Sequence, residues 1–131
     1  MFPLNIRVLV VDDMMTMRKL VSRALKEIGF TDIIEAADGA KGYEALVNSD
    51  RPVGLIVSDW NMPNTTGVDL LRRVRAEGRF KDTPFILLTA ESEASQVTEA
   101  LKAGVSGYVV KPFTVDGLRA QIMNAHKKLA G

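Results

Sequence analysis

Five short apolar runs alternate with five segments that carry apolar residues at helical spacing, and this alternation constrains the fold more than any other feature. We interpret the apolar runs as buried strands over residues 6–11, 32–36, 55–59, 84–89 and 107–110. The segments between and after them repeat apolar residues every three or four positions, which predicts helices over 17–28, 38–47, 66–78, 92–104 and 114–129. Strand–helix alternation favours an α/β fold with a five-stranded parallel sheet and helices on both faces.

Residues that favour helix ends support these boundaries. Short polar side chains that suit an N-cap stand at Asp38, Thr66, Ser92 and Thr114. Glycines that can close a helix stand at Gly29, Gly78 and Gly104. Within the helices, Leu20 and Leu101 fall on the faces that we expect to be inward. Charges flank the 32–36 run, which indicates a strand near an edge of the sheet.

Length and composition exclude several classes of protein. A chain of 131 residues fits one domain over 1–131, and we expect no output domain. A net charge of +1 creates no field that would favour nucleic acid or a membrane surface as a partner. The absence of cysteine excludes disulfides, thiolate metal sites and thiol catalysis. With no signal-like start and no long apolar run, we expect a cytoplasmic monomer.

Polar residues stand at the carboxyl ends of four of the five predicted strands. Asp12 and Asp13 follow the first, Asp59 ends the third, Thr89 ends the fourth and Lys111 follows the fifth. In an open parallel sheet these ends share one edge, which is where ligands bind. Each residue alone has a simpler role, as a helix cap, a loop-starting Asp, a strand residue or a surface lysine. Their coincidence at one edge is what indicates a site.

Three carboxylates at one edge require a cation or altered protonation. Two unit charges about 4 Å apart repel by roughly 4 kcal/mol at an effective dielectric constant near 20. Oxygen ligands without His or Cys suit Mg²⁺, which commonly shares its ligand shell with phosphate. The ammonium group of Lys111 and the hydroxyl of Thr89 are suited to hold phosphoryl oxygens. A carboxylate can itself accept a phosphoryl group, so we expect Asp59 to be the acceptor.

The motifs of this chain resemble the receiver domain of bacterial two-component response regulators along its whole length. The matching stretches are Val10–Asp13, Ser58–Pro63, Thr89–Glu91 and Tyr108–Phe113. The chain is most similar to stand-alone chemotaxis regulators, especially over 59–63 and 16–18. This resemblance implies the flavodoxin-like strand order 2-1-3-4-5.

The resemblance also implies roles for the residues at the sheet edge. Asp59 would accept a phosphoryl group from the phosphohistidine of a histidine kinase. Asp13, Asp59 and the backbone carbonyl of Asn61 would hold Mg²⁺ directly, and Asp12 would reach it through water. Lys111 and Thr89 would grip the phosphoryl oxygens.

One further pair of residues would switch the conformation, and another pair would set the rate of dephosphorylation. Thr89 would move toward the phosphoryl group and Tyr108 would swing inward, which changes the face of the last two helices and the last strand. That face would bind an output partner such as the flagellar motor switch. Asn61 and Glu91 would tune the rate at which water removes the phosphoryl group, and a phosphatase is a further candidate partner. The chain would assist these steps as a regulator and not as a dedicated enzyme.

Two departures from the family pattern concern the partner and not the chemistry. Ala94 and Gln121 stand where chemotaxis regulators of the best-known type carry lysines. Met14 and Met15 replace an aromatic residue and a serine beside the acidic pair. A regulator or phosphate sink of a non-motor phosphorelay is therefore an alternative. We also expect Trp60 to be partly exposed and His126 to be solvated.

Two other classes of protein share parts of this pattern. A Mg²⁺-dependent phosphohydrolase of the dehalogenase-like type needs a second Asp two residues after its nucleophile, but Met14 follows Asp12–Asp13. A flavin carrier needs a Ser-, Thr- and Gly-rich phosphate loop after the first strand, where this chain has two acids.

Overall fold

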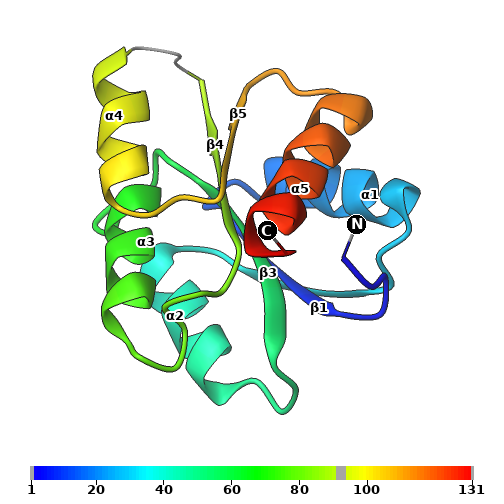
Figure 1. Ribbon diagram of the computed structural model, residues 1–131, viewed down its shortest axis with the longest axis horizontal. Helices are drawn as coiled ribbons and strands as arrows, with labels where there is room; N and C mark the ends of the chain where they lie inside the picture. Colours follow the sequence, from blue (N-terminus) through cyan, green and yellow to red (C-terminus); the bar gives the residue numbers. More distant parts are fainter. Residues whose placement is uncertain (1, 91–93, 131) are drawn as a thin grey trace.

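The computed structural model describes residues 2–90 and 94–130, and these form five strands and five helices in strict alternation (Figure 1). The elements are β1 (Arg7–Val11), α1 (Met15–Ile28), β2 (Asp32–Ala36), α2 (Gly39–Asn48), β3 (Val53–Asp59), α3 (Gly67–Ala76), β4 (Phe85–Thr89), α4 (Ala94–Lys102), β5 (Gly107–Val110) and α5 (Val115–Ala130). All strands are parallel, in the order β2-β1-β3-β4-β5. The predicted fold class, strand order and edge position of 32–36 are confirmed.

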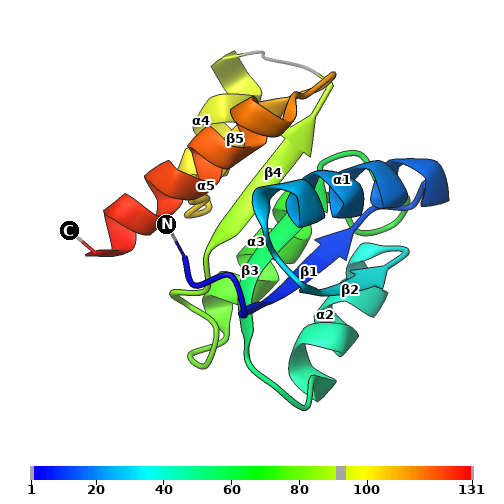
Figure 2. The same cartoon turned by 90° about the vertical axis from the view of Figure 1, so that its right-hand side faces the viewer.

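Two apolar clusters fill the space between the sheet and its helices. Successive strand residues point to opposite faces, so Val8 and Val10 of β1 lie in one cluster while Leu9 and Val11 lie in the other. Helices α1 and α5 cover the first face, and α2, α3 and α4 cover the second (Figure 2). None of the helices in the described part of the chain is both long and apolar enough to cross a membrane.

Local chemistry fixes most of the helix ends that the sequence predicts. The side chains of Asp38, Thr66 and Thr114 each accept a backbone N–H from the residue three positions later. Gly29 ends α1 with a φ of 126°, a conformation that glycine adopts without strain. The predicted cap Ser92 lies outside the described residues. Helix α3 ends at Ala76, two residues before Gly78, because the backbone of Glu77 is already extended.

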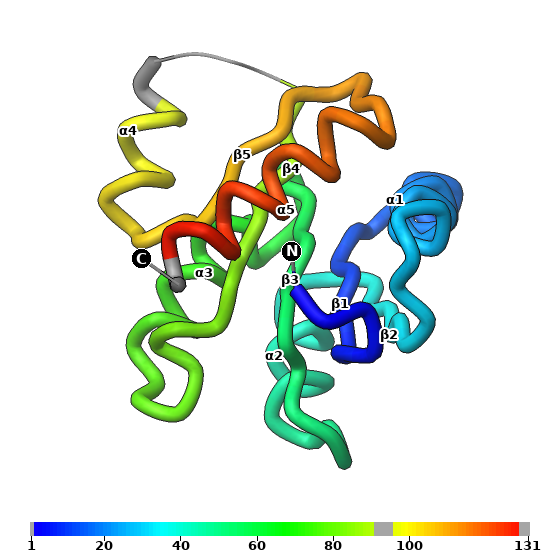
Figure 3. Tube along the Cα trace, turned by 45° about the vertical axis from the view of Figure 1, so that its right-hand side comes forward, coloured from blue at the N-terminus to red at the C-terminus, as the bar shows by residue number. Residues whose placement is uncertain are grey.

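Three predictions about exposure are wrong. Leu20 and Leu101 are 47% and 60% exposed, because each lies beyond the stripe of its helix that packs on the sheet. His126 is only half-exposed, and its ring meets that of Phe2 edge-on with the centroids 4.8 Å apart. The N-terminal segment thus runs beside α5 (Figure 3), and that contact could not be read from local sequence.

The strand register brings the carboxyl ends of the strands to one edge. Val11 pairs with Ser58, Asp59 pairs with Leu88, and Thr89 pairs with Val110. The last residues of β1, β3, β4 and β5 therefore lie at nearly the same level.

Candidate functional site

Three carboxylates meet at this edge of the sheet. Asp12 and Asp13 follow β1 directly, and Asp59 is the last residue of β3. Each offers an oxygen within 4.8 Å of the oxygens of the other two. Asp12 and Asp59 are buried, while Asp13 is exposed to solvent. The sequence prediction that these groups lie close together is confirmed.

Asp12 carries an oxygen with no hydrogen-bond partner. Its Oδ1 accepts the backbone N–H of Met14 at 2.9 Å, whereas Oδ2 is buried and accepts no hydrogen bond from the described residues. Burial raises the pKa of Asp12, and the negative charges of Asp59 and Asp13 raise it further. The hydrogen bond from the backbone of Met14 and the positive charge of Lys111 lower the pKa but do not cancel this rise. A buried carboxylate oxygen without a donor, next to two further carboxylates, fits a hard divalent cation such as Mg²⁺.

Among the described residues, Lys111 is the only one whose side chain forms ion pairs with the acids of this cluster. Its Nζ lies 2.7 Å from Asp59 Oδ1 and 3.8 Å from Asp12 Oδ2, and its side chain is 17% exposed. The backbone N–H of Lys111 donates to the carbonyl of Thr89 at 2.7 Å, which fixes where its side chain begins. The Lys111–Pro112 peptide bond, left open by the sequence, is cis. The carboxylate of Asp59 thus contacts an ammonium group and lies close to two further carboxylates.

The two predicted switch residues lie on the adjacent strands β4 and β5. Thr89 ends β4 and is fully buried, and its hydroxyl donates to Oε1 of Gln96 on α4 at 3.3 Å. Tyr108 lies on β5 and is half-buried. Its backbone N–H points to Oε1 of Gln121, the residue that replaces the expected lysine, at 3.5 Å.

The remaining predicted residues lie around these groups. Asn61 is exposed in the loop after β3, two residues beyond Asp59. Glu91 lies outside the described residues, and Ala94 is the first residue of α4. Met14 and Met15 are 62% and 64% exposed beside the acids.

Trp60 is buried, with 6% exposure, so the prediction of partial exposure is wrong. Its backbone N–H donates to the carbonyl of Leu88 at 2.8 Å, and its own carbonyl accepts the N–H of Gly67 at 2.9 Å. These bonds hold the chain after β3 against the protein, so the indole packs with the α2–α3 side of the core. Gly67 is required here because a Cβ would lie 2.2 Å from the carbonyl oxygen of Asp59.

Two contacts to the site were missed by sequence reasoning. Arg18 donates to the carbonyl of Asp12 at 2.9 Å and to Glu35 at 3.3 Å, so it supports the acidic loop from α1. Its position in the first turn of α1, five residues after Asp13, is the signal that could have indicated this. The Gln96 contact had no sequence signal, because it depends on how α4 packs.

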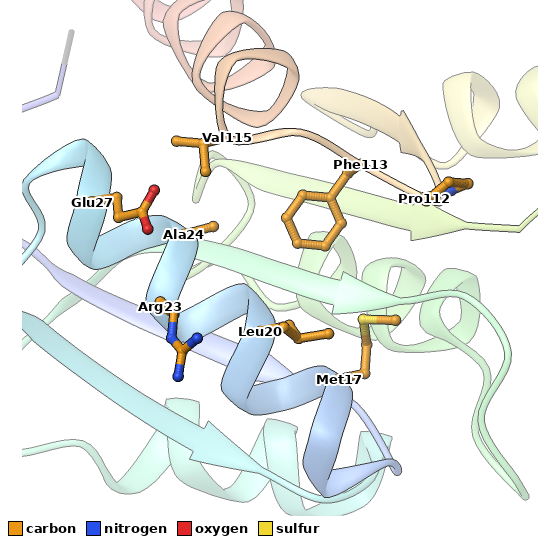
Figure 4. A pocket seen from close by; sticks show the side chains of 8 residues that line it. All are labelled: Met17, Leu20, Arg23, Ala24, Glu27, Pro112, Phe113 and Val115. Atoms are coloured by element: carbon orange, nitrogen blue, oxygen red, sulfur yellow. The ribbon is translucent and has the colours of Figure 1, made fainter.

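A separate, mostly apolar cavity of about 270 Å³ lies between α1 and the turn after Lys111 (Figure 4). Met17 and Leu20 on α1 face Phe113 across it, and none of the three acids lines it. Its only charged lining residues are Arg23 and Glu27, and it holds neither a carboxylate cluster nor Lys111, which leaves the acidic cluster as the candidate site.

Comparison with known proteins agrees with this geometry. The model of the response regulator receiver domain family matches residues 8–123. The chain is 43% identical over 125 residues to chemotaxis protein CheY of Pseudomonas aeruginosa, covering 95% of this chain and 99% of that protein. It is 44% identical over 117 residues to chemotaxis protein CheY1 of Helicobacter pylori, covering 88% and 93%.

Solved structures give the same result. A structure of chemotaxis protein CheY4 of Vibrio cholerae superposes with a TM-score of 0.84 at 31% identity, covering 92% of this chain and 98% of that one. A receiver domain protein from Clostridium thermocellum superposes with a TM-score of 0.83 at 26% identity, covering 96% and 99%. Fold, motifs and acidic edge together show that the chain belongs to the response regulator receiver domain family, as a CheY-like regulator of phosphorylation-dependent two-component signalling.

Proposed function

We propose that Asp59 is the phospho-acceptor of this regulator and takes its phosphoryl group from a phosphohistidine of a histidine kinase. The observation that carries the proposal is the surroundings of Asp59. Its carboxylate is 6% exposed at the open edge of the sheet, contacts the ammonium group of Lys111 at 2.7 Å, and lies beside two more carboxylates. Among the three acids, Asp59 alone accepts a hydrogen bond from that ammonium group.

The transfer needs a nucleophile, a leaving group and charge neutralisation. A carboxylate oxygen of Asp59 attacks phosphorus, the bond from phosphorus to the imidazole nitrogen breaks, and the nitrogen keeps the electron pair and takes up a proton. Lys111 then pairs with the phosphoryl oxygens, and Thr89 donates its hydroxyl to them. This chemistry is mainly positioning and electrostatic stabilisation.

Mg²⁺ is the cofactor that the acidic cluster would hold. Asp13, Asp59 and the backbone carbonyl of Asn61 would be its direct ligands, and Oδ2 of Asp12, which accepts no hydrogen bond from the described residues, would reach it through water. When bound, the ion neutralises negative charge on the acids and on the phosphoryl oxygens.

Output would follow from a two-state equilibrium around Thr89 and Tyr108. New contacts between Thr89 and the phosphoryl group favour one state, and Tyr108 moves inward as the buried threonine shifts. The face of α4, β5 and α5 then binds a partner, for which the flagellar motor switch is the leading candidate because the relatives are chemotaxis proteins. Ala94 and Gln121 on this face make a different output partner the alternative. Asn61 and Glu91 would set how fast water removes the phosphoryl group.

Intact mass after incubation with acetyl phosphate and Mg²⁺ tests the proposal. We expect wild type to gain one phosphoryl group and Asp59→Asn to gain none. Asp69→Asn is the matched control, because Asp69 is an exposed carboxylate on α3 that does not belong to the acidic cluster. Equal labelling of wild type and Asp59→Asn would refute the assignment. Sustained release of phosphate from small esters would instead favour a phosphohydrolase.

A further inference from the structure

We infer that Gln96 is a positioning residue that holds Thr89 in the unphosphorylated state and couples α4 to the acceptor site. The inference rests on the proposed function and deepens it. Thr89 is fully buried at the end of β4, and its hydroxyl donates to Oε1 of Gln96 at 3.3 Å. The oxygen of a glutamine amide only accepts hydrogen bonds, so the donor in this pair is the threonine.

The hydrogen bond from Thr89 to Gln96 competes with the hydrogen bond that Thr89 would donate to a phosphoryl group. A threonine hydroxyl carries a single hydrogen that it can donate. The hydrogen given to Gln96 cannot at the same time be given to a phosphoryl oxygen on Asp59. The active state therefore requires that the hydrogen bond between Thr89 and Gln96 break. The free energy of this bond stabilises only the inactive state.

This single hydrogen bond matters for the position of α4 because the helix is otherwise sparsely packed. Among the side chains of α4 that the structure describes, only Ala100 is buried. Beyond that residue, α4 is tied to α3 by an ion pair between Glu99 and Arg72 at 2.7 Å, with both side chains more than 40% exposed. An exposed ion pair contributes little to stability, so α4 is weakly held. Release of Gln96 would thus loosen the first turns of α4, which forms part of the output face.

The test is the affinity of Mg²⁺-loaded protein for beryllofluoride, a phosphoryl mimic, followed through the fluorescence of Trp60, the only tryptophan. Gln96→Met keeps the length of the side chain and removes the acceptor. We expect its dissociation constant to fall by roughly threefold to tenfold, the range for loss of one hydrogen bond that only the inactive state makes. Thr98→Ala, on the exposed face of α4, is the matched control and should leave the constant unchanged.

A second background separates positioning from general loosening. In a Thr89→Val protein the hydroxyl is gone, so adding Gln96→Met should change beryllofluoride affinity no further. Denaturant midpoints verify that each variant is folded. An unchanged or weakened affinity of Gln96→Met, or the same gain in the Thr89→Val background, would overturn the inference while the proposed function stands. If wild type binds no beryllofluoride and takes no phosphoryl group, the proposed function fails, and the inference fails with it.

Discussion

Replacing Lys111 with Met should destabilise the protein strongly in the absence of Mg²⁺ and weakly in its presence. The ammonium group faces Asp59 at 2.7 Å and Asp12 at 3.8 Å, and both carboxylates are buried. At an effective dielectric constant near 20, these distances correspond to gross attractions of about 6 and about 4 kcal/mol. Lys111→Met removes both attractions and leaves three acids without a counter-charge.

The measured loss will be smaller than the gross attraction. Breaking a buried ion pair costs about 3–5 kcal/mol, and water entering at the 17% exposed side chain reduces this figure. We therefore expect Lys111→Met to lower the free energy of unfolding by about 2–3 kcal/mol in EDTA. With saturating Mg²⁺ the cation replaces the lost charge, and we expect the loss to shrink below about 1 kcal/mol.

Urea denaturation followed by circular dichroism measures both values. Lys102→Met is the control, because Lys102 is exposed at the end of α4 and should show no dependence on Mg²⁺. In the double variant Lys111→Met, Asp59→Asn, removal of one acid should recover part of the loss in EDTA. Equal losses with and without Mg²⁺, or a loss no larger than that of Lys102→Met, would refute the charge-balance argument.

Three further predictions concern residues around the site and the fold. Burial alone would raise the pKa of Glu35, but hydrogen bonds from three neighbouring side chains lower it, so this residue stabilises the folded state above its unfolded pKa. Stability should therefore fall as pH drops below about 5, and Glu35→Gln should flatten that fall in pH-dependent urea titrations; an unchanged slope would contradict this. Gly67→Ala should cost about 1–3 kcal/mol and reduce phosphoryl acceptance, because its Cβ would lie 2.2 Å from the carbonyl oxygen of Asp59; wild-type labelling and stability would show that the loop adapts. Arg75→Met should lower stability by roughly 2–4 kcal/mol in urea denaturation, since its guanidinium donates to three backbone carbonyls between α3 and β5; a loss like that of an exposed arginine would exclude this role.

Strand–helix periodicity made most of the fold predictable. Parallel strands place their carboxyl ends together whatever lies between them, so the meeting of Asp12, Asp59 and Lys111 followed from the position of each in its own strand. Side-chain exposure was harder to predict, because the burial of Trp60 involves a backbone hydrogen bond to Leu88, which is distant in sequence, and packing against the α2–α3 side of the core. The contact between Thr89 and Gln96 depends on helix packing, which local periodicity does not encode.

The parallel sheet has a consequence for how this protein is made. Asp12 and Asp59 are synthesised well before Lys111, which leaves the ribosome only after β5. Until then, an emerging chain that has already paired β1 with β3 carries mutually repelling acids and no ammonium group to offset them. A divalent ion in the surrounding medium would substitute for the missing lysine during that interval. When the last strand joins the sheet, the ammonium group of Lys111 arrives and offsets the charge of the acids.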